Sequence, residues 1–424
     1  MRRRFASFGG TVLGLLIIMA LLAGTVSAAD TGTVVGTGFN GPQGVLVAPD
    51  GSVWVIDSGV GGDKEITVKD PESGQDIKVT VGETARVVQI APDGKQTVAA
   101  TLPSMASPQE ASGGNRLALL NGVVYATSGG WTETSNGPTA APNTGAVVKI
   151  EGGTAVEVAQ PWKLELDKNP GGFAKDSHPY GLLAGPDGNL WVTDAGGNDL
   201  LKVNPSTGQV DLVAVFPGIP GPMANPGRGG AKESDPVPTA VAVGSDGGIY
   251  VSLLPGAPFL PGSAKVVKVA ADGTLSDYAT GLTMLTDLRL APDGNLYAVS
   301  FGEFTEQGPI PGMGKLLRIK PGSASEVVVS GLMFPTSIAF NPAGDAYVTT
   351  NGVGAPGSGQ VVLYKGLTSM AGSPLPPPTL PTTGAGLARG ALSIGWEVAF
   401  GLALMGAGLI LRNRKAMAFS RSRH

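Results

Sequence analysis

Short apolar runs, each interrupted by a glycine turn, recur along the chain. Residues 44–57 (GVLVAPDGSVWVID) return as residues 181–194 (GLLAGPDGNLWVTD) and, in part, as residues 288–300 (LRLAPDGNLYAVS). Three weaker copies surround Gly122, Gly247 and Gly344. In all six copies an aromatic residue stands three positions after the turn glycine: Trp54, Tyr125, Trp191, Tyr250, Tyr297 and Tyr347. The chain therefore contains six repeats of one unit.

Each unit begins with a predicted β-hairpin. An Asp-Gly or Asn-Gly pair supplies the positive-φ turn, and the flanking residues are β-branched or aromatic. A third strand is predicted after each hairpin, at residues 85–90, 146–150, 200–203, 265–269, 315–319 and 360–364. A fourth strand follows only five of these, at residues 96–102, 155–159, 210–216, 275–280 and 326–330. A matching segment, residues 33–38, precedes the first repeat.

The missing sixth copy of the fourth strand predicts a closed ring. In a propeller of four-stranded blades, an N-terminal strand can complete the last blade, so that no sheet edge stays open. We therefore predict an all-β fold: a six-bladed β-propeller ectodomain over residues 30–366, closed by an N-terminal strand and followed by one C-terminal transmembrane helix. The six aromatic residues are predicted to pack blade against blade.

Composition agrees with an all-β fold and limits the chemistry. The chain has 66 glycines and 34 prolines among 424 residues, and both residue types are poor inside helices. Cysteine is absent, which excludes disulfides, thiolate zinc sites and a cysteine nucleophile. The chain has only two histidines, His178 and His424, so a histidine-rich metal site is excluded too.

Both ends of the chain are predicted to be targeting segments. Residues 1–29 combine a basic start, an apolar run and small residues at a cleavage site, as in a secretory signal peptide. Residues 391–411 (ALSIGWEVAFGLALMGAGLIL) are long enough to cross a bilayer, with Glu397 as their one charge. Residues 412–424 form a basic tail, which predicts that this end stays in the cytoplasm.

A pentapeptide before the predicted helix indicates how the protein is anchored. A proline-rich linker, residues 367–379, leads to Leu380, Pro381, Thr382, Thr383 and Gly384. This LPTTG motif, followed by an apolar helix and a basic tail, resembles the cell-wall sorting signal of Gram-positive-type surface proteins. The resemblance implies that a sortase cleaves between Thr383 and Gly384. The alternative is a single-pass anchor that stays in the membrane through residues 391–411. Either reading predicts an extracytoplasmic protein at the cell surface.

The charge of the ectodomain argues against one class of partner. Nine of the 29 basic residues and only one of the 33 acidic residues lie outside residues 30–388, which leaves that part with a net charge of −12. An acidic surface repels phosphate backbones, so nucleic acid is not an expected partner.

The predicted loops sort onto two faces. The turns within each strand pair 1–2 and 3–4 are short, whereas the other connections are long: residues 59–84, 129–144, 160–177, 217–237, 253–263 and 302–313. Antiparallel neighbours place all these long connections on one face, which we call the long-loop face. Long loops on a rigid scaffold commonly carry binding sites, so the site is predicted there and at the channel mouth.

Several segments resemble the ScyD/ScyE family. They are residues 102–104 (LPS), 177–181 (SHPYG), 194–201 (DAGGNDLL), 237–239 (VPT), 256–259 (GAPF) and 261–262 (PG), within a match from about Gly36 to Tyr364. The resemblance implies a six-bladed propeller of the NHL and gluconolactonase-like type, in a family named for cyanobacterial scytonemin gene clusters and thought to be exported. The resemblance carries no catalytic residues over to this chain.

One position in each repeat is predicted to line the channel. It lies seven residues before the turn glycine and is occupied by Gly44, Asn115, Gly181, Ala240, Asp287 and Ser337. Small or polar residues there suit a narrow wet channel. The alternative is that Asn115 and Asp287, from opposite repeats, help to hold a hard cation, as in similar propeller hydrolases. No cofactor is identified from the sequence, and calcium is the single candidate.

The candidates for ligand contact at the channel mouth are His178, Tyr180, Asp194 and Asn198. His178 is the only ectodomain histidine and thus the only general-base candidate of its type. The sequence nevertheless favours a loop residue bonded to backbone for His178, and it favours turn formation for Asp194 and Asn198.

Two functions remain open at this stage, and we favour the non-enzymatic one. The first is a surface-displayed module that binds a ligand or protein through the long-loop face. The second is a metal-dependent, calcium-type hydrolase or lactonase that acts in the channel.

Overall fold

The strands of the protein form a ring of antiparallel sheets. The computed structural model describes residues 32–69, 76–107, 111–305, 308–322 and 325–369. Within these ranges there are six sheets with four consecutive antiparallel strands each, which we number as blades 1 to 6, and three two-stranded sheets in the connections. Blade 1 is widened by two additional strands. The sheets therefore match the six predicted repeats.

The first three blades run from residue 42 to residue 215. Blade 1 contains β2 (Pro42–Val47), β3 (Val53–Asp57), β5 (Asp76–Ile90) and β6 (Gln96–Ala106). Blade 2 contains β8 (Gly114–Leu120), β9 (Val123–Ser128), β11 (Ala146–Glu151) and β12 (Thr154–Ala159). Blade 3 contains β14 (Pro179–Ala184), β15 (Leu190–Asp194), β16 (Asp199–Val203) and β17 (Val210–Val215).

The last three blades complete the ring. Blade 4 contains β20 (Pro238–Val243), β21 (Ile249–Leu253), β22 (Ala264–Val269) and β23 (Leu275–Leu282). Blade 5 contains β24 (Leu285–Leu290), β25 (Leu296–Ser300), β28 (Gly314–Arg318) and β29 (Glu326–Leu332). Blade 6 contains β30 (Ser337–Phe340), β31 (Ala346–Thr350), β32 (Gly359–Tyr364) and, from the other end of the chain, β1 (Thr33–Phe39).

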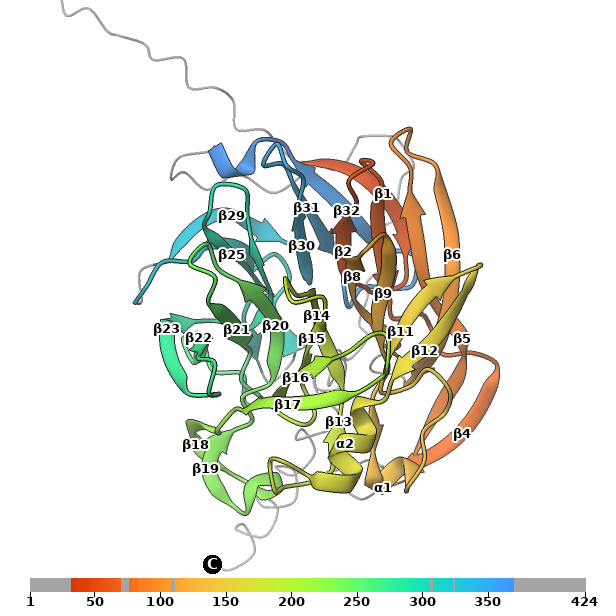
Figure 1. Cartoon of the computed structure of the whole chain (residues 1–424), viewed down its shortest axis with the longest axis vertical. Helices are drawn as coiled ribbons and strands as arrows, with labels where there is room; N and C mark the ends of the chain where they lie inside the picture. Colours follow the sequence, from red (N-terminus) through yellow and green to blue (C-terminus); the bar gives the residue numbers. More distant parts are fainter. Residues whose placement is uncertain (1–31, 70–75, 108–110, 306–307, 323–324, 370–424) are drawn as a thin grey trace, which may run out of the picture.

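The ring closes through the N-terminal strand. Strand β1 pairs antiparallel with β32, from Thr33 opposite Leu363 to Phe39 opposite Gly359. The first strands of successive blades contact one another in the order β2, β8, β14, β20, β24 and β30, and β30 contacts β2 (Figure 1). The fold is therefore a β-propeller, and the predicted role of the N-terminal strand is confirmed by this pairing.

Apolar clusters hold neighbouring blades together. Six such clusters each combine residues from two adjacent blades, and each includes one of the six repeat aromatics. The pairs are Trp54 with Leu117, Tyr125 with Leu182, Trp191 with Val241, Tyr250 with Leu288, Tyr297 with Ile338, and Tyr347 with Val45. Aromatic side chains supply large buried areas, so these residues stabilise the ring as predicted.

The long connections carry extra elements. Strand β4 (Lys64–Lys69) pairs with the early part of β5, and β7 (Ala111–Ser112) pairs with β6. Further pieces are β10 (Trp131–Thr132), α1 (Glu133–Asn136), α2 (Pro161–Lys168), β13 (Asp176–Ser177), β18 (Ile219–Asn225), η1 (Pro226–Arg228), β19 (Ala231–Ser234), β26 (Phe304–Thr305) and β27 (Gly308–Pro309). Figure 1 shows β4, α1, α2, β18 and β19 together at the bottom of the view.

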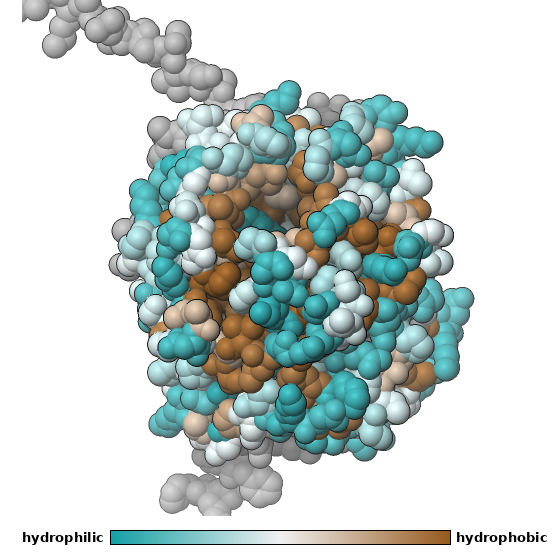
Figure 2. Space-filling view, viewed as in Figure 1, coloured by the Kyte–Doolittle hydropathy of each residue, from teal (hydrophilic) through white to brown (hydrophobic). Residues whose placement is uncertain are grey.

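Figure 2, in the same view, shows hydrophobic side chains around the middle of the visible face and mostly hydrophilic side chains along its rim.

Short turns connect the strands at the opposite end from the extra elements. In blade 1, for example, the amide of Gly51 donates to the Ala48 carbonyl at 3.0 Å. The extra elements therefore define the long-loop face.

The predicted targeting segments are not part of this description. The signal peptide (1–29), the sorting motif (380–384), the transmembrane helix (391–411) and the tail (412–424) all lie outside the described residues. In the described part of the chain, no helix is both long and apolar enough to span a bilayer. The short helix η2 (Leu367–Ser369) follows β32, and Leu367 is fully buried against blade 6, although the sequence analysis assigned it to the linker.

Candidate functional site

One residue of each first strand forms a ring around the propeller axis, which we call the axial row. In five blades it is the predicted channel residue, paired with the residue two places after the blade aromatic: Gly44 with Ile56, Gly181 with Thr193, Ala240 with Ser252, Asp287 with Val299 and Ser337 with Thr349. In blade 2, Leu117 pairs with Ala126, and the Arg116 amide donates to Thr127 Oγ1 at 3.1 Å. The blade 2 residue of the axial row is therefore Arg116, and the placement of Asn115 in this row was wrong.

The error has a local cause. In blade 1, Leu46 pairs with Trp54, whereas in blade 2 the equivalent pair is Ala118 with Tyr125. The connection between the paired residues is one residue shorter in blade 2, so counting back from Gly122 gives a position one residue too early.

Asn115 belongs to a neighbouring row that connects adjacent blades. Its Nδ2 donates to the Pro179 carbonyl of blade 3 at 3.0 Å. Threonines at the same position of other blades do the same: Thr239 Oγ1 donates to the Leu285 carbonyl at 2.7 Å, and Thr336 Oγ1 donates to the Pro42 carbonyl at 2.6 Å. Asn115 therefore acts as a structural link between two blades.

Arg116 contacts four other blades from the centre of the ring. Its side chain is fully buried, and Nη1 donates to the carbonyl of Gln43 in blade 1. Nη2 donates to the carbonyls of Thr286 in blade 5, at 2.5 Å, and Thr336 in blade 6, at 2.9 Å. The guanidinium carbon lies 4.5 Å from the centre of the Tyr180 ring in blade 3, within the range of a cation–π contact.

Asp287 is the carboxylate that balances this charge. Its Oδ1 lies 3.9 Å from Arg116 Nε and 3.3 Å from Arg289 Nε. Its Oδ2 accepts hydrogen bonds from Ser337 Oγ at 2.6 Å and from the Ile338 amide at 3.0 Å. Burial alone would raise the pKa of Asp287, but the two guanidinium groups and the two donors lower it below its usual value. Asp287 is therefore ionised and fully engaged.

These contacts do not fit a calcium ion beside Asp287. Calcium is held by six to eight oxygen ligands, usually with several carboxylates. Among the residues of the axial row Asp287 is the one carboxylate, and two positive side chains already face it. Within the described ranges, no group of three or more Asp, Glu or His side chains is arranged to hold a metal. The position where the sequence predicted a metal is next to the Arg116 guanidinium.

The long-loop end of the channel is filled by an apolar group, which we call the mouth cluster: Tyr180, Ala195, Val237, Leu254, Phe259, Met284 and Phe301, with partly buried Ala257, Phe304, Phe334 and Val353. Val237, Met284 and Phe334 have φ values of 44°, 41° and 44°. Such values are costly for bulky residues and tend to occur at functional sites. The carbonyls of these three residues accept amide hydrogen bonds from Leu254, Phe301 and Gly352, at the ends of the second strands.

His178 holds the equivalent position in blade 3, where its carbonyl accepts the Ala195 amide at 2.9 Å. The side chain is only 2% exposed, and its ring lies edge-on to Tyr180 with 5.9 Å between ring centres. Burial lowers the pKa of His178 to about 4, so the ring is neutral at pH 7. An efficient general base has a pKa near the working pH and can reach its substrate, and His178 meets neither condition.

Asp194 organises the turn that follows β15. Its Oδ1 accepts the amides of His178 (2.6 Å), Gly196 (3.1 Å) and Gly197 (3.0 Å), and its Oδ2 accepts Ser177 Oγ (2.5 Å). Burial raises the pKa of Asp194, and these four donors oppose the rise. The turn-capping role predicted first for Asp194 is therefore seen directly.

Asn198 connects this turn to blade 4. It has a φ of 58°, which asparagine tolerates better than most residues. Its Nδ2 donates to the Gly196 carbonyl at 3.0 Å, and its Oδ1 accepts the Val237 amide at 3.0 Å. The four candidates for ligand contact thus lie close together on blade 3. Asp194 and Asn198 bind backbone groups there, and the rings of His178 and Tyr180 pack against each other.

A buried carboxyl cluster beside this turn was missed by the sequence analysis. Glu165, on α2, is 3% exposed, and Asp199, at the start of β16, is 1% exposed. Burial and the nearby charge of Asp194 raise the pKa of Glu165 to about 8, against an opposing effect of Lys175. Burial and the charges of Asp194 and Glu165 raise the pKa of Asp199 well above its usual value. The surroundings therefore favour the protonated form of both carboxyl groups.

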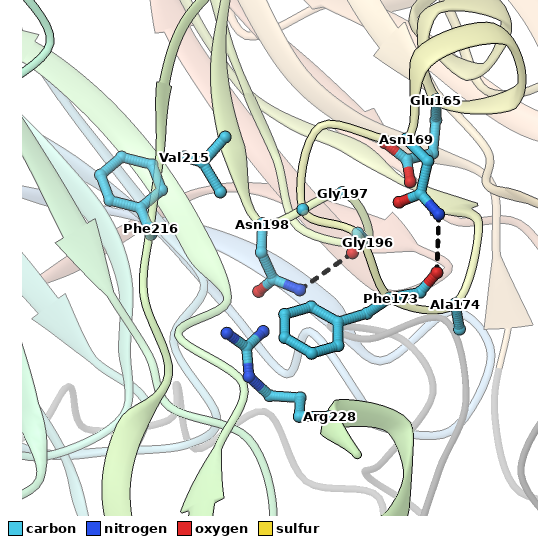
Figure 3. A pocket seen from close by; sticks show the side chains of 11 residues that line it. Glu165, Asn169, Phe173, Ala174, Gly196, Gly197, Asn198, Val215, Phe216 and Arg228 are labelled. Atoms are coloured by element: carbon cyan, nitrogen blue, oxygen red, sulfur yellow. Dashed lines mark hydrogen bonds between the residues drawn. The ribbon is translucent and has the colours of Figure 1, made fainter. Parts of the chain in front are cut away.

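A small cavity adjoins this cluster (Figure 3). Its volume is about 20 Å³, and Glu165, Asn198, Phe173 and Arg228 are among its lining residues. The Arg228 guanidinium lies over the Phe173 ring at 4.2 Å and donates from Nε to Glu233 Oε1 at 2.6 Å. A cavity of this size holds about one water molecule. It is too small for an organic substrate.

Part of the chain is similar to a known protein family. The family described as SMP-30/Gluconolactonase/LRE-like region matches residues 181–354, from blade 3 to blade 6. No curated protein matches the sequence.

Solved structures with a similar fold include the PQQ-bound aldose sugar dehydrogenase from Streptomyces coelicolor, with 13% identity and a TM-score of 0.48, over 78% of this chain and 96% of that one. A putative glucose dehydrogenase from Thermus thermophilus has 18% identity and a TM-score of 0.46, over 78% and 98%. A gluconolactonase from Xanthomonas campestris has 13% identity and a TM-score of 0.45, over 78% and 88%.

Proposed function

We propose that the protein is an exported, surface-anchored β-propeller of the ScyD/ScyE type, and that it binds a ligand or protein partner through its long-loop face without catalysis. The anchoring part of this proposal rests on the sequence of residues 1–29, 380–384 and 391–411. The binding part rests on the described ectodomain.

The observation that carries the binding role is the distribution of exposed large apolar side chains. Of the eleven such residues in the described ranges, five lie on the long connections and two more on the short connection or strand end between other blades at the same face: Val60, Phe173, Met223, Leu260 and Ile310, with Met105 and Met333. Contiguous exposed apolar patches mark interaction sites, whereas single exposed apolar residues are ordinary, so the binding role is proposed from the bias of these side chains toward one face. Three of the seven are methionines, whose flexible side chains adapt to different partner surfaces.

The backbone of the mouth cluster supports the same face. Val237, Met284 and Phe334 hold left-handed conformations, which cost on the order of 1–3 kcal/mol each. Their side chains lie in the mouth cluster, and Met333, next to Phe334, is 41% exposed. Strain retained at three equivalent positions of the ring is expected where the resulting arrangement has a function.

The family match favours a second candidate, a metal-dependent, calcium-type hydrolase or lactonase that acts in the channel. Three features of this chain argue against a hydrolase or lactonase. Arg116 and Asp287 occupy the position of the predicted metal, His178 is buried with a pKa of about 4, and the mouth cluster packs the long-loop end.

Site-specific photo-crosslinking in producing cells tests the binding role. A photoreactive residue at Leu260 or Met333 is expected to capture a partner, whereas one at Leu212 or Val98 is not. Leu212 and Val98 are matched controls because they are 44% and 51% exposed and lie on outer strands of blades 3 and 1. Equal capture at all four positions, or capture only at the controls, would contradict a role for the long-loop face.

The hydrolase candidate needs its own measurement. A panel of lactones and esters is incubated with the full-length protein in detergent, with calcium or with chelator. We expect no turnover above that of the heat-denatured protein. Calcium-dependent turnover that Asp287→Asn abolishes would establish the second candidate instead.

A further inference from the structure

We infer that Arg116 is the protein's own axial cation: its guanidinium occupies an oxygen-lined cation site at the centre of the ring, and this site accepts a free guanidinium ion once the side chain is removed. The inference does not depend on the binding role proposed above.

The surroundings of Arg116 have the composition of a cation site. Three main-chain carbonyls of other blades, of Gln43, Thr286 and Thr336, accept hydrogen bonds from its two terminal nitrogens, and the carbonyl of Asn115 in its own strand accepts a fourth at 3.2 Å. The Asp287 carboxylate supplies a negative charge 3.9 Å from Nε, and the Tyr180 ring covers one face of the guanidinium. Carbonyl oxygens, a carboxylate and a π-face are the groups that recognise a planar cation.

These groups are held in place by the rest of the fold. The Tyr180 hydroxyl donates to Gln43 Oε1 at 3.1 Å, and Gln43 Nε2 donates to the Gly352 carbonyl at 2.9 Å. Ser337 and the Ile338 amide hold Asp287 Oδ2. The three carbonyls belong to first strands or their entry segments in blades 1, 5 and 6, which are fixed in the ring. Removal of Arg116 would therefore leave the oxygens in position around an empty space.

The glycine at the blade 1 position of the axial row lets the strand that carries Arg116 approach closely. Gly44 and Gly181 hold this row on either side of Arg116. A Cβ atom at Gly44 would lie 3.1 Å from the Arg116 Cα and 2.7 Å from the Asn115 carbonyl oxygen. A larger residue at Gly44 would therefore displace the strand that carries Arg116.

The shape of the site favours guanidinium over a metal ion. The donors of Arg116 spread in a plane toward three separate blades, whereas a metal ion needs its ligands to converge on a single point. Asp287 is the one carboxylate paired with Arg116 among the residues that the structure describes, and Arg289 already shares it. A divalent ion would thus find too few charged oxygens.

Chemical rescue tests the inference. The full-length Arg116→Ala protein is melted with increasing guanidinium chloride at 0–100 mM. We expect its melting temperature to rise with a saturable dependence, with half-saturation on the order of 1 mM for so small an ion. At a guanidinium concentration about one hundred times the half-saturation constant, the melting temperature should rise by about 5 °C. The wild-type protein should show no rise, because its site is filled.

Three controls separate this effect from others. Urea has the same planar shape as guanidinium but no charge, so it should not raise the melting temperature of Arg116→Ala. Leu117→Ala, on the same strand and 1% exposed in the native chain, removes a buried apolar side chain and should not respond to guanidinium. Calcium chloride tests the metal alternative: stabilisation of Arg116→Ala by calcium and not by guanidinium would overturn the inference, as would the absence of any stabilisation.

A second measurement applies even if Arg116→Ala does not fold. In the wild-type protein, the Nε–H signal of Arg116 is recorded in a nitrogen-detected NMR spectrum. The signal is assigned by its absence from the spectrum of Arg116→Lys. Its exchange with solvent should be at least about 100-fold slower than that of Arg86, whose side chain is 27% exposed. Equal exchange rates would show that the guanidinium is not enclosed and would overturn the inference.

Discussion

The buried carboxyl cluster of blade 3 predicts a specific dependence of stability on pH. Glu165 has a pKa of about 8 in the folded protein, against 4.5 for an ordinary glutamate. Below pH 4.5 the folded and unfolded chains both keep this proton, and the full stability is present. As the pH rises to about 8 only the folded chain keeps it, so the free energy of unfolding falls by a total on the order of 5 kcal/mol.

The perturbation is Glu165→Gln, which keeps the shape of the side chain and removes its titration. The free energy of unfolding of the wild type should fall between pH 5 and pH 8 by about 1.4 kcal/mol per pH unit through Glu165 alone. Asp199, whose pKa is raised in the same direction, adds to this fall. Glu165→Gln should therefore be less sensitive to pH than the wild type, and more stable at pH 8.

Urea unfolding at pH 5, 6, 7 and 8, followed by tryptophan fluorescence, measures this difference. Asp211→Asn is the matched control, because Asp211 is exposed on β17 of the same blade. The control should follow the wild type at every pH. If Glu165→Gln loses as much stability between pH 5 and pH 8 as the wild type does, Glu165 does not hold a buried proton and the reasoning fails.

Three further outcomes are expected. A chelator should leave the melting temperature of the full-length protein unchanged in differential scanning fluorimetry; a fall that calcium reverses would contradict the description of the axis. Arg86→Ala removes the Nε and Nη2 donors, which lie 3.0 and 2.5 Å from Oδ2 of buried Asp57. The free energy of unfolding measured in urea should therefore fall by about 3–5 kcal/mol. Lys78→Ala, in an exposed pair, should leave the urea midpoint nearly unchanged, and an equal loss would refute the burial argument. Mass spectrometry of wall-released protein should find a C-terminal peptide ending at Thr383, which Leu380→Ala should abolish; a peptide that continues past Gly384 would indicate a membrane anchor.

The strands and the ring could be predicted because they depend on local signals that repeat. Turn glycines, alternating apolar residues and one aromatic per unit set the hairpins, and these signals recur six times. The N-terminal strand could be predicted from counting, since five fourth strands follow six third strands. The long β4–β5 extension could not, because its residues, such as Lys64 and Glu65, are mostly exposed and carry no core pattern.

The site residues were harder to predict because they depend on register and on loop conformation. A turn shorter by one residue moved Arg116 into the axial row, and only the strand pairing reveals this. A signal was available: five of the six repeats have an apolar residue after the predicted channel position, and the second repeat has Arg116 instead. Glu165 gave no such signal, because its burial results from α2 packing under a long connection.

The pairing of β1 with β32 has a consequence for the order in which the protein can fold. Thr33 and Leu363, which pair in blade 6, lie at opposite ends of the ectodomain sequence. A chain that emerges from its N-terminus presents β1 first and β32 last, so β1 stays without its partner while the other blades assemble. Contacts of such long sequence separation form slowly. Until the last repeat has emerged, the ring has an open seam, and an exposed strand on each side of it must be kept from pairing with other chains.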